Sequence, residues 1–457
     1  MNKILSQCAA MSQLLILFIV CTTVFSVSAQ EKEEKIKMSS DAKIARDYSL
    51  TMLDEMKEIL KENHYDPAMR GIDLDKRIET AKTRVKTMQY NWQMYRVLVQ
   101  VLMDFNDSHT RMILPPRSDY FQYGFAMQMI GDECFVTSVK KDSDAQKQGI
   151  AVGDQIVLLG KFKPNRRDLW KMTYVLYKLD PANTLDVKIR KPDGAENSLT
   201  VKAKTMTDKE FRAERKARKE KHKYEPFKCQ EVSKEVVACK LYSFIVEKND
   251  IDKMMKQAAK YPKFILDLRG NGGGYVIIEQ YLLSHFFNRE VAIADLVTKK
   301  KTETTVTKPL GDREYKGEVA VLVDSNSASA AEITARVLQL ENRAKIYGDV
   351  SSGSVMTSIA LPFRNIVSSF ADAAIIHTGM SVTVADVIMR DRSRLEDKGV
   401  VPDEVLKPSA VSMAKKTDPV LAYAAAKFGA TVTPEQTGSY YFMVEKDEND
   451  SDDGEPQ

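Results

Sequence analysis

The feature of this sequence that most constrains its fold is an alternation of strand-like and helix-like segments between residues 224 and 428. The apolar runs "KFILDL", "EVAVLV" and "KIYGDV" have the length of buried strands, and helical segments such as "YVIIEQYLLSHFF" lie between them. Alternation of this kind predicts a layered α/β core. Because a single hydrophobic core rarely grows beyond about 250 to 300 residues, the 457 residues of the chain predict two or three domains.

A helical cap and a small β domain are predicted ahead of this core, which we place at residues 206–428. Residues 30–118 show helical periodicity over "ARDYSLTMLDEMKEILKENHYD" and "KRIETAKTRVKTMQYNWQMYRVLVQVLMDF", and they close on "NDSHTRMILPP". Residues 119–205 change to five short strand-like stretches with one small helix at "SDAQKQGI". The sequence therefore predicts a multi-domain α/β protein.

The stretch "DAQKQGIAVGDQIVLLG" within residues 119–205 resembles the most recognisable part of a PDZ domain. A PDZ domain holds the carboxy terminus of a peptide as an added strand, and backbone amides of an early loop receive the terminal carboxylate. The resemblance implies that this loop is "YGFAM", so that Tyr123, Gly124, Phe125 and Ala126 would bind a peptide. The alternative is an unrelated small β domain.

The two ends of the chain differ in composition from the rest. Lys3 precedes the apolar run "LLILFIVC" and the small residues "SVSA", which predicts a secretory signal peptide over residues 1–29 and export to the periplasm, the cell envelope or the medium. A single N-terminal membrane anchor is the alternative. The acidic ending "EKDENDSDDGEPQ" predicts a disordered tail, which we place at residues 429–457.

Charge and cysteine content argue against several classes of site. The net charge of +4 is too small for a chain of this length to imply a nucleic-acid or membrane partner, and the basic run at 206–224 is interpreted as a solvated linker helix. Cys134, Cys229 and Cys239 remain after the predicted signal peptide, and this odd, sparse set argues against a disulfide framework. No pair of these cysteines has metal-site spacing. We expect neither a metal nor an organic cofactor.

Three separated stretches carry candidate chemistry. In "VLVDSNSASAAEI", Ser329 and Glu332 match a capping box at the start of an amphipathic helix, and this common signature by itself indicates only a helix start. "DLRGNGGG", residues 267–274, lacks the lysine and hydroxyl of a phosphate loop, and its bare glycine amides suit an oxyanion hole instead. The third stretch is "LEDKGVVPDEV", residues 395–405.

Together with the PDZ-like segment, these stretches resemble the C-terminal processing peptidases, also called tail-specific proteases, and their tricorn-core relatives. The resemblance implies a crotonase-like α/β core and a serine peptidase that recruits polypeptide substrates through their carboxy termini. It implies that Ser329, in the Ser-Ala-Ser pattern, is the nucleophile. It also implies that the amides of Ala330 and of Gly273 form the oxyanion hole.

One position departs from the processing peptidases. Their serine is paired with a lysine twenty-five residues further on, and this chain has Ser354 there, whose hydroxyl cannot replace a lysine amine as a base. The tricorn-core relatives use a histidine, a second serine and a glutamate instead. The matching residues are His109, Ser108 and Glu396, with Asp397 as the alternative acid.

Two further alternatives remain open. In the first, Lys345 serves as the base, although its place in "RAKIYG" points it along a strand. In the second, the chain is a peptide- or ligand-binding protein that keeps the fold without catalysis. The other histidines, His64, His222, His285 and His377, lack matching context. The sequence thus predicts an exported serine endopeptidase that uses Ser329 with His109 as base, and it leaves the oligomeric state open.

Overall fold

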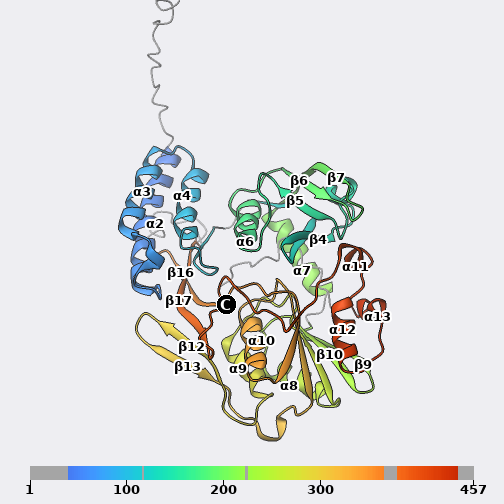
Figure 1. Ribbon diagram of the computed structural model, residues 1–457. Helices are drawn as coiled ribbons and strands as arrows, with labels where there is room; N and C mark the ends of the chain where they lie inside the picture. Colours follow the sequence, from blue (N-terminus) through green and yellow to red (C-terminus); the bar gives the residue numbers. More distant parts are fainter. Residues whose placement is uncertain (1–39, 116–117, 222–224, 365–377, 441–457) are drawn as a thin grey trace, which may run out of the picture. The chain divides into compact units, whose positions relative to one another are not determined.

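The computed structural model describes residues 40–115, 118–221, 225–364 and 378–440 (Figure 1). The predicted signal peptide and the acidic ending "EKDENDSDDGEPQ" lie outside the described residues. Across the ranges that are described, no helix is long and apolar enough to cross a membrane.

A six-stranded sheet forms the centre of the predicted α/β core. Its strand order is β18-β15-β14-β11-β10-β9, and all neighbours are parallel except the pair of β9 with β10. The strand-like runs named above become β11, β14 and β15, which confirms them as strands. The six strands are β9 (Phe227–Ser233), β10 (Val236–Leu241), β11 (Lys263–Asp267), β14 (Glu318–Val323), β15 (Ala344–Gly348) and β18 (Glu404–Val405).

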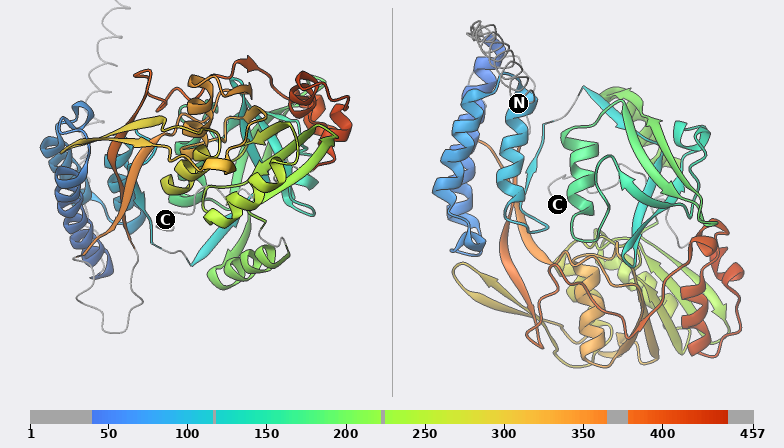
Figure 2. Two further views of the ribbon diagram at one scale, coloured as in Figure 1. Left: turned by 90° about the horizontal axis from the view of Figure 1, so that it is seen from below. Right: turned by 45° about the horizontal axis from the view of Figure 1, so that its top comes forward.

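Helices cover both faces of this sheet. Successive side chains of a strand point to opposite faces, and accordingly Val321 packs in one apolar cluster while Leu322 packs in another. The first cluster lies under α8 (Lys248–Ala258), α9 (Val276–Ser284) and α10 (Ala330–Leu340), and the second lies under α12 (Pro419–Lys427). Figures 1 and 2 show α10 and α12 on opposite sides of the strands, so the core has three layers.

A second sheet joins the helical region to the core. The order is β1-β17-β12-β13, with β16 also paired to β17. Its strands are β1 (Arg111–Ile113), β12 (Ala292–Thr298), β13 (Thr302–Val306), β16 (Met356–Pro362) and β17 (Gly379–Met389). Because β1 pairs with β17, residues 111–113 belong to a sheet of the core, and the predicted helical cap at 30–118 extends too far in sequence.

The helical region consists of three helices and one short turn: α2 (Ser40–Asn63), η1 (Met69–Gly71), α3 (Leu74–Thr87) and α4 (Asn91–Met103). The second periodic stretch is two helices rather than one, because Met88 and Tyr90 are extended. The buried faces of all three helices pack with Met380 and Val382 of β17 in one apolar cluster.

Residues 119–207 form the small β unit. The predicted five strands are present, in the order β3-β4-β5-β6-β7, with β3 at an edge. They are β3 (Phe125–Ile130), β4 (Glu133–Val139), β5 (Gln155–Leu159), β6 (Thr184–Arg190) and β7 (Glu196–Lys202). The predicted small helix is α5 (Asp144–Lys147). A second helical segment, α6 (Leu169–Thr173) continued by η2 (Tyr174–Leu179), was not expected from the sequence.

A two-stranded sheet of β2 (Asp119–Gln122) and β8 (Lys204–Thr207) closes the small β unit. The basic run then forms α7 (Asp208–Lys221), so its interpretation as a helix is confirmed over those residues.

The expectation of no disulfide is wrong. Cys229 and Cys239 are joined, with their Cα atoms 4.0 Å apart. They occupy directly opposite positions of the antiparallel pair β9 and β10, a register that counting cysteines along the sequence does not show. Cys134 stays free and buried, and burial raises the pKa of its thiol to about 12.

The predicted disordered tail begins too early. Residues 429–440 are described, and α13 (Pro434–Gly438) lies among them after α11 (Ala410–Ala414) and α12. Thr433 caps α13 by accepting from the backbone N–H of Gln436, and Pro434 occupies the first helical turn, where its missing N–H is harmless. Thr437 is buried and donates to the carbonyl of Asp418 at 2.7 Å. A few local caps thus order a segment of low apolar content.

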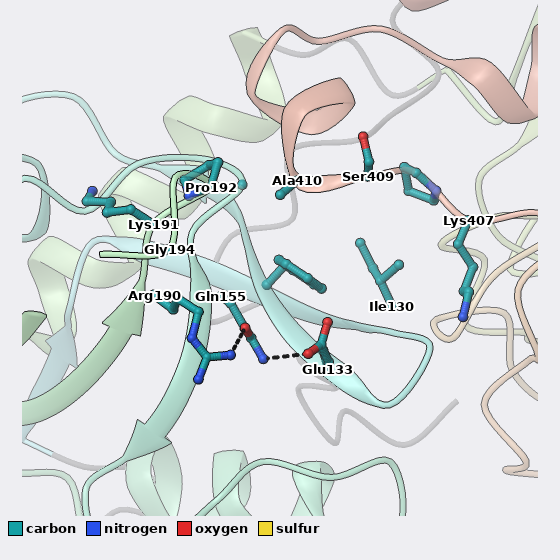
Figure 3. A pocket seen from close by; sticks show the side chains of 13 residues that line it. Ile130, Glu133, Gln155, Arg190, Lys191, Pro192, Gly194, Lys407, Ser409 and Ala410 are labelled. Carbon is teal, nitrogen blue, oxygen red and sulfur yellow. Dashed lines mark hydrogen bonds between the residues drawn. The ribbon is translucent and has the colours of Figure 1, made fainter. Parts of the chain in front are cut away.

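A cavity of about 420 Å³ lies between the small β unit and residues 407–410 (Figure 3). On its wall, Gln155 donates to Glu133 at 3.0 Å and accepts from Arg190 at 3.0 Å. The side chains lining it are polar and charged for the most part, and the candidate residues named from the sequence are not among them. The candidate chemistry therefore lies elsewhere.

Candidate active site

The Gly-rich loop and the Ser329 loop leave neighbouring strands at the same end. β11 and β14 are parallel, with Asp267 opposite Leu322, so the residues that follow both strands emerge side by side. The loops are also bonded directly, since the N–H of Ala328 donates to the carbonyl of Asn271 at 2.9 Å. Two motifs far apart in sequence thus meet at one edge of the sheet.

Ser329 sits on a strained turn between β14 and α10. Its φ of 54° and ψ of −121° are unfavourable for a residue with a side chain. Such strain persists only where the surroundings enforce it, and it is common at functional sites. A serine on a sharp strand-to-helix turn is also the arrangement that exposes the nucleophile in serine hydrolases of the α/β-hydrolase fold.

Glu332 holds this turn in place. Its Oε2 accepts from the N–H of Ser329 at 3.1 Å, which is the glutamate half of the predicted capping box. The same carboxylate accepts from Ser351 Oγ at 2.6 Å, from the N–H of Gly353 at 2.8 Å and from the N–H of Ser354 at 3.0 Å. Burial raises the pKa of Glu332 to about 7, although these hydrogen bonds oppose the rise. The capping residue therefore also fixes the loop that replaces the family's lysine turn.

Gly273 lies against Ser329, as expected, but its amide is engaged. A Cβ at Gly273 would lie 2.7 Å from Ser329 Cβ. The N–H of Gly273, however, donates to Asn271 Oδ1 at 2.8 Å, so it would have to leave Asn271 before it could bind an oxyanion. Within the described residues, the N–H groups of Gly272, Gly274 and Ala330 have no hydrogen-bond partner.

Ser108, His109 and Glu396 form one hydrogen-bonded cluster. Ser108 Oγ lies 2.6 Å from His109 Nδ1 and 3.1 Å from Glu396 Oε2, and the N–H of Ser108 donates to Glu396 Oε1 at 2.9 Å. Burial raises the pKa of Glu396 to about 7, hydrogen bonds from Ser108 and Val355 oppose the rise, and the charge of Asp107 adds to it. The structure thus brings together three residues that the sequence named.

The loop around Ser354 connects this cluster to Ser329. The carbonyl of Ser354 accepts from the N–H of Ser329 at 3.0 Å, and the N–H of the next residue, Val355, donates to Glu396 Oε2 at 2.7 Å. Ser354 therefore holds the backbone of the candidate nucleophile Ser329, and the next residue, Val355, holds the carboxylate of the candidate acid Glu396.

The two alternative residues lie apart from the cluster. Asp397 has a half-exposed side chain that faces Arg70 at 3.7 Å. Lys345 is exposed on β15, 3.8 Å from Asp403. Of the two adjacent acids, Glu396 is the one that contacts Ser108.

Asp107 and His64 support the cluster and were missed in the sequence. Asp107 Oδ1 accepts from the N–H of His109 at 3.0 Å and from Thr383 Oγ1 at 2.9 Å, while its Oδ2 lies 3.8 Å from His64 Nε2. Burial alone would raise the pKa of Asp107, but His64, Thr110 and Thr383 lower it to about 2. The aspartate two residues before His109 was the only signal available, because His64 is brought close by the fold.

The predicted peptide-binding loop lies at the start of β3. Tyr123, Phe125 and Ala126 are buried, and the Tyr123 hydroxyl donates to the carbonyl of Ala182 at 3.0 Å. Gly124 has a φ of 84°, a value that favours glycine, and a Cβ there would lie 2.4 Å from Ser143 Cβ. The loop is thus tightly packed at one end of an edge strand.

Replacing Gly273 by alanine is expected to lower kcat/KM by about 10²- to 10³-fold, the usual loss when an oxyanion hole is disturbed. The new Cβ would meet Ser329 Cβ at 2.7 Å and the carbonyl of Ala328 at 2.9 Å, so the Ser329 turn must move. Gly270→Ala is the matched control, because Gly270 also has a positive φ, 72°, but an added Cβ meets nothing within 4 Å. Equal losses in the two variants would mean that backbone strain alone is responsible.

Comparison with known proteins relates part of the chain to a peptidase family. Residues 236–406 match the model of peptidase family S41. A probable CtpA-like serine protease of Staphylococcus aureus (strain COL) is 26% identical over 257 residues, covering 54% of this chain and 47% of that protein. A carboxyl-terminal-processing protease of Synechocystis sp. is 29% identical over 159 residues, covering 34% of each chain. The chain thus spans about half, or less, of the length of these relatives.

Solved structures share the fold at low sequence identity. Mature CPAF superposes with a TM-score of 0.63 at 14% identity, covering 81% of this chain and 94% of that chain. The photosystem II D1 C-terminal processing protease superposes with a TM-score of 0.50 at 17% identity, covering 79% and 93%. These findings confirm the resemblance that the three motifs indicated. The chain therefore carries a domain of peptidase family S41 at residues 236–406.

Proposed function

We propose that the protein is a serine endopeptidase that cleaves polypeptides by acyl transfer through Ser329, with His109 as general base. The observation that carries the proposal is the hydrogen-bonded series Glu396, Ser108, His109, joined to the strained Ser329 turn through Ser354 and Val355. The match of residues 236–406 to the S41 family model and the likeness to processing proteases support it.

The ionised Glu396 determines which nitrogen of His109 can act as base. A carboxylate only accepts hydrogen bonds, so the Ser108 hydroxyl donates its single proton to Glu396. Ser108 Oγ must then accept from His109, which places the imidazole proton on Nδ1 and leaves the lone pair on Nε2. The relay therefore selects the tautomer that a general base needs.

The reaction then follows from these positions. The Ser329 Oγ–H bond breaks as its proton passes to His109 Nε2, and Oγ bonds to the carbonyl carbon of the scissile peptide. The imidazolium returns the proton to the leaving amine, and water hydrolyses the acyl-enzyme by the same two proton transfers. The oxyanion would be held by the N–H of Ala330, at the start of α10, and by an amide of the Gly-rich loop. Gly273, which lies against Ser329, would supply that amide after its N–H leaves Asn271 Oδ1, and the N–H groups of Gly272 and Gly274 are the alternatives.

We further propose that the small β unit is a PDZ-like domain and that the core is of the crotonase-like type. The edge strand β3 and the helical segment α6 with η2 belong to the same packed unit, since Phe125 and Tyr177 share one apolar cluster. Peptide recognition by strand addition needs such an edge beside a helix. Substrates would enter through their carboxy termini near Gly124.

Export of the protein is proposed from the first 29 residues and from the disulfide. Cys229 and Cys239 form a bond that persists in oxidising compartments such as the periplasm or the extracellular space. In this proposal the signal peptide precedes the helical region, the small β unit and the S41 domain.

A non-catalytic binding protein is the second candidate, motivated by the serine at the lysine position. The two are separated by incubating the purified chain with a fluorophosphonate probe and with an unfolded polypeptide, followed by mass spectrometry of new termini. Covalent labelling at Ser329 together with new termini supports the peptidase. The labelling is repeated from roughly pH 5 to 9, a range around the pKa of a histidine. If the chain binds peptides with free carboxy termini but is not labelled at any of these pH values, the binding protein is supported.

Replacing Glu396 by glutamine is expected to lower kcat/KM by about 10- to 100-fold, the loss that corresponds to about 1 to 3 kcal/mol for one unsatisfied buried group. Glu396 Oε2 accepts from both Ser108 Oγ and the N–H of Val355, and an amide nitrogen at that place would face donors. In the wild type, activity should rise with pH through about 7, because Glu396 must be ionised. The part of this rise that belongs to Glu396 should be lost in the variant, which keeps only the inflection of His109 near about 6.5. The whole dependence should persist in Asp397→Asn, whose side chain faces Arg70.

The same substitution has a predicted effect on stability. The pKa of Glu396 is about 7 in the folded chain and near its usual 4.5 in the unfolded chain, so the folded state binds more protons between these values. Stability therefore falls as the pH rises through this window. The slope of Tm against pH should be smaller in Glu396→Gln. The slope that remains is expected to come from Glu332, because burial raises the pKa of that carboxyl to about 7 as well. An unchanged slope would contradict the raised pKa.

A further inference from the structure

The loop before Ser329 is bonded to the small β unit through residues outside the candidate catalytic set. Gln128 in β3 donates from Nε2 to Asp324 Oδ2 at 2.8 Å and to Ser325 Oγ at 3.2 Å. Ser325 Oγ in turn donates to the carbonyl of Met129. The end of the edge strand β3 is thus held against the first residues of the Ser329 loop.

Asp324 connects both loops of the candidate site. Its Oδ1 accepts from the N–H of Gly270 at 2.8 Å in the Gly-rich loop and from the N–H of Asn326 at 3.0 Å in the Ser329 loop. Ser327 Oγ lies 3.3 Å from the same oxygen. One carboxylate oxygen therefore sets the separation of the two loops, while the other oxygen faces Gln128.

We propose that Gln128 is a positioning residue for the reaction at Ser329 and acts through Asp324. Its amide fixes the rotation of the Asp324 carboxylate, which keeps Oδ1 between the two loop amides. A rotated carboxylate would let the Gly-rich loop shift relative to Ser329, and shifts of about 1 Å reduce rates by about 10²-fold. The inference rests on the proposed peptidase function and gives the small β unit a part in the site's geometry besides recruiting peptides.

A separate anchor makes this contact testable by mutation. Arg166 of the small β unit donates to the carbonyl of Val350 at 2.9 Å and pairs with Asp349, and the N–H of Gly131 donates to Asp349 Oδ2 at 2.7 Å. These bonds hold the small β unit to the core independently of Gln128. A substitution at Gln128 should therefore change the positions of the Gly-rich loop and the Ser329 loop, while the small β unit stays bonded to the core.

The test uses a reciprocal pair of substitutions. Gln128→Glu places a carboxylate opposite Asp324 where an amide donated at 2.8 Å, and the two like charges should push Asp324 out of its position. Asp324→Asn keeps an oxygen for the amides of Gly270 and Asn326. In the double variant, the new amide at position 324 can donate to the new carboxylate at position 128, which restores one hydrogen bond with donor and acceptor exchanged.

Gln155→Glu is the matched control. Gln155 belongs to the same small β unit, and the substitution likewise sets a carboxylate against another, that of Glu133, at 3.0 Å (Figure 3). Among the described residues, the Gln155 side chain forms hydrogen bonds only with Glu133 and Arg190, and with neither loop. It therefore reports the effect of an added charge in this unit alone.

The first readout is the second-order rate of fluorophosphonate labelling of the full chain. We expect Gln128→Glu to lower it by about 10- to 100-fold, Gln155→Glu to leave it within about threefold, and the double variant to return to within about threefold of Asp324→Asn. Equal rates for the two single glutamate variants, or no recovery in the double variant, would overturn the proposal.

The second readout does not depend on activity. Amide hydrogen exchange over residues 268–274 and 324–329 should be faster in Gln128→Glu than in the wild type and should return in the double variant. If the wild type is not labelled but exchange changes as expected, the peptidase function fails while the coupling of the loops stands. Unchanged exchange in a labelled wild type refutes the coupling alone.

Discussion

Ser329→Ala is expected to abolish proteolysis and fluorophosphonate labelling, with a loss of kcat of about 10⁴- to 10⁶-fold. Ser329 Oγ is the atom that forms the acyl bond in the proposed reaction, and alanine has no nucleophilic atom to replace it on the strained turn. The backbone bonds of Ser329 to Ser354 and Glu332 do not involve the hydroxyl, so the fold should be retained.

The measurement is the initial rate of peptide cleavage, with labelling followed by mass spectrometry and Tm recorded for each variant. Ser393→Ala is a control, since its hydroxyl contacts only the exposed Asp391. If Ser329→Ala kept more than about one tenth of the wild-type rate, acyl transfer through this residue would be wrong.

His109→Ala is expected to lower kcat by about 10²- to 10⁴-fold, the range for loss of a general base. The imidazole both removes the Ser329 proton and returns it to the leaving amine, so both halves of the reaction should slow. KM should change little, because the ring binds the transition state rather than the resting substrate. The inflection of the pH profile that belongs to the histidine, near about 6.5 for an unperturbed ring, should vanish.

His285→Ala serves as the matched histidine control. His285 belongs to the S41 domain. Its Nε2 lies 3.3 Å from Asp252 Oδ1 and its Nδ1 lies 3.2 Å from the carbonyl oxygen of Arg313, so its partners are not members of the candidate cluster. Its loss should change Tm and leave the pH profile as it is. A wild-type rate in His109→Ala, with the profile intact, would require a different base and would revive the lysine alternatives.

The candidate site was predictable where its residues lie in local motifs. The Gly-rich loop, the Ser329 turn and the Ser108-His109 pair each occupy a few consecutive residues, and the strand and helix periodicities around them are local as well. Even there, the sequence could not show that the amide of Gly273 donates to Asn271, because a loop's internal hydrogen bonds depend on its exact path. It also could not separate Glu396 from Asp397, since the turn between them decides which carboxylate points inward.

The boundaries of the fold were less predictable than its elements. From the sequence, β1 was assigned to the helical cap. In the structure β1 pairs with β17, where Arg111 lies opposite Ser381, more than 260 residues later in the sequence. The disulfide between Cys229 and Cys239 was not expected, because its formation depends on the register of two strands. Residues 429–440 were assigned to the tail because their composition is poor in apolar residues, whereas local caps and packing in one apolar cluster with α12 hold them in the structure.

By itself, the sequence predicted the alternating core, the helix start at Ser329, the Gly-rich loop and the candidates Ser108, His109 and Glu396 for the place of the family's lysine. Periodicity and short motifs are properties of neighbouring residues, and they persist whatever the rest of the chain does. Only the tertiary structure decided that Ser108 meets Glu396 across 288 positions and that Gln128 meets Asp324 across 196. Such contacts form when strands pair and layers pack, so their partners are chosen by the register of the whole fold.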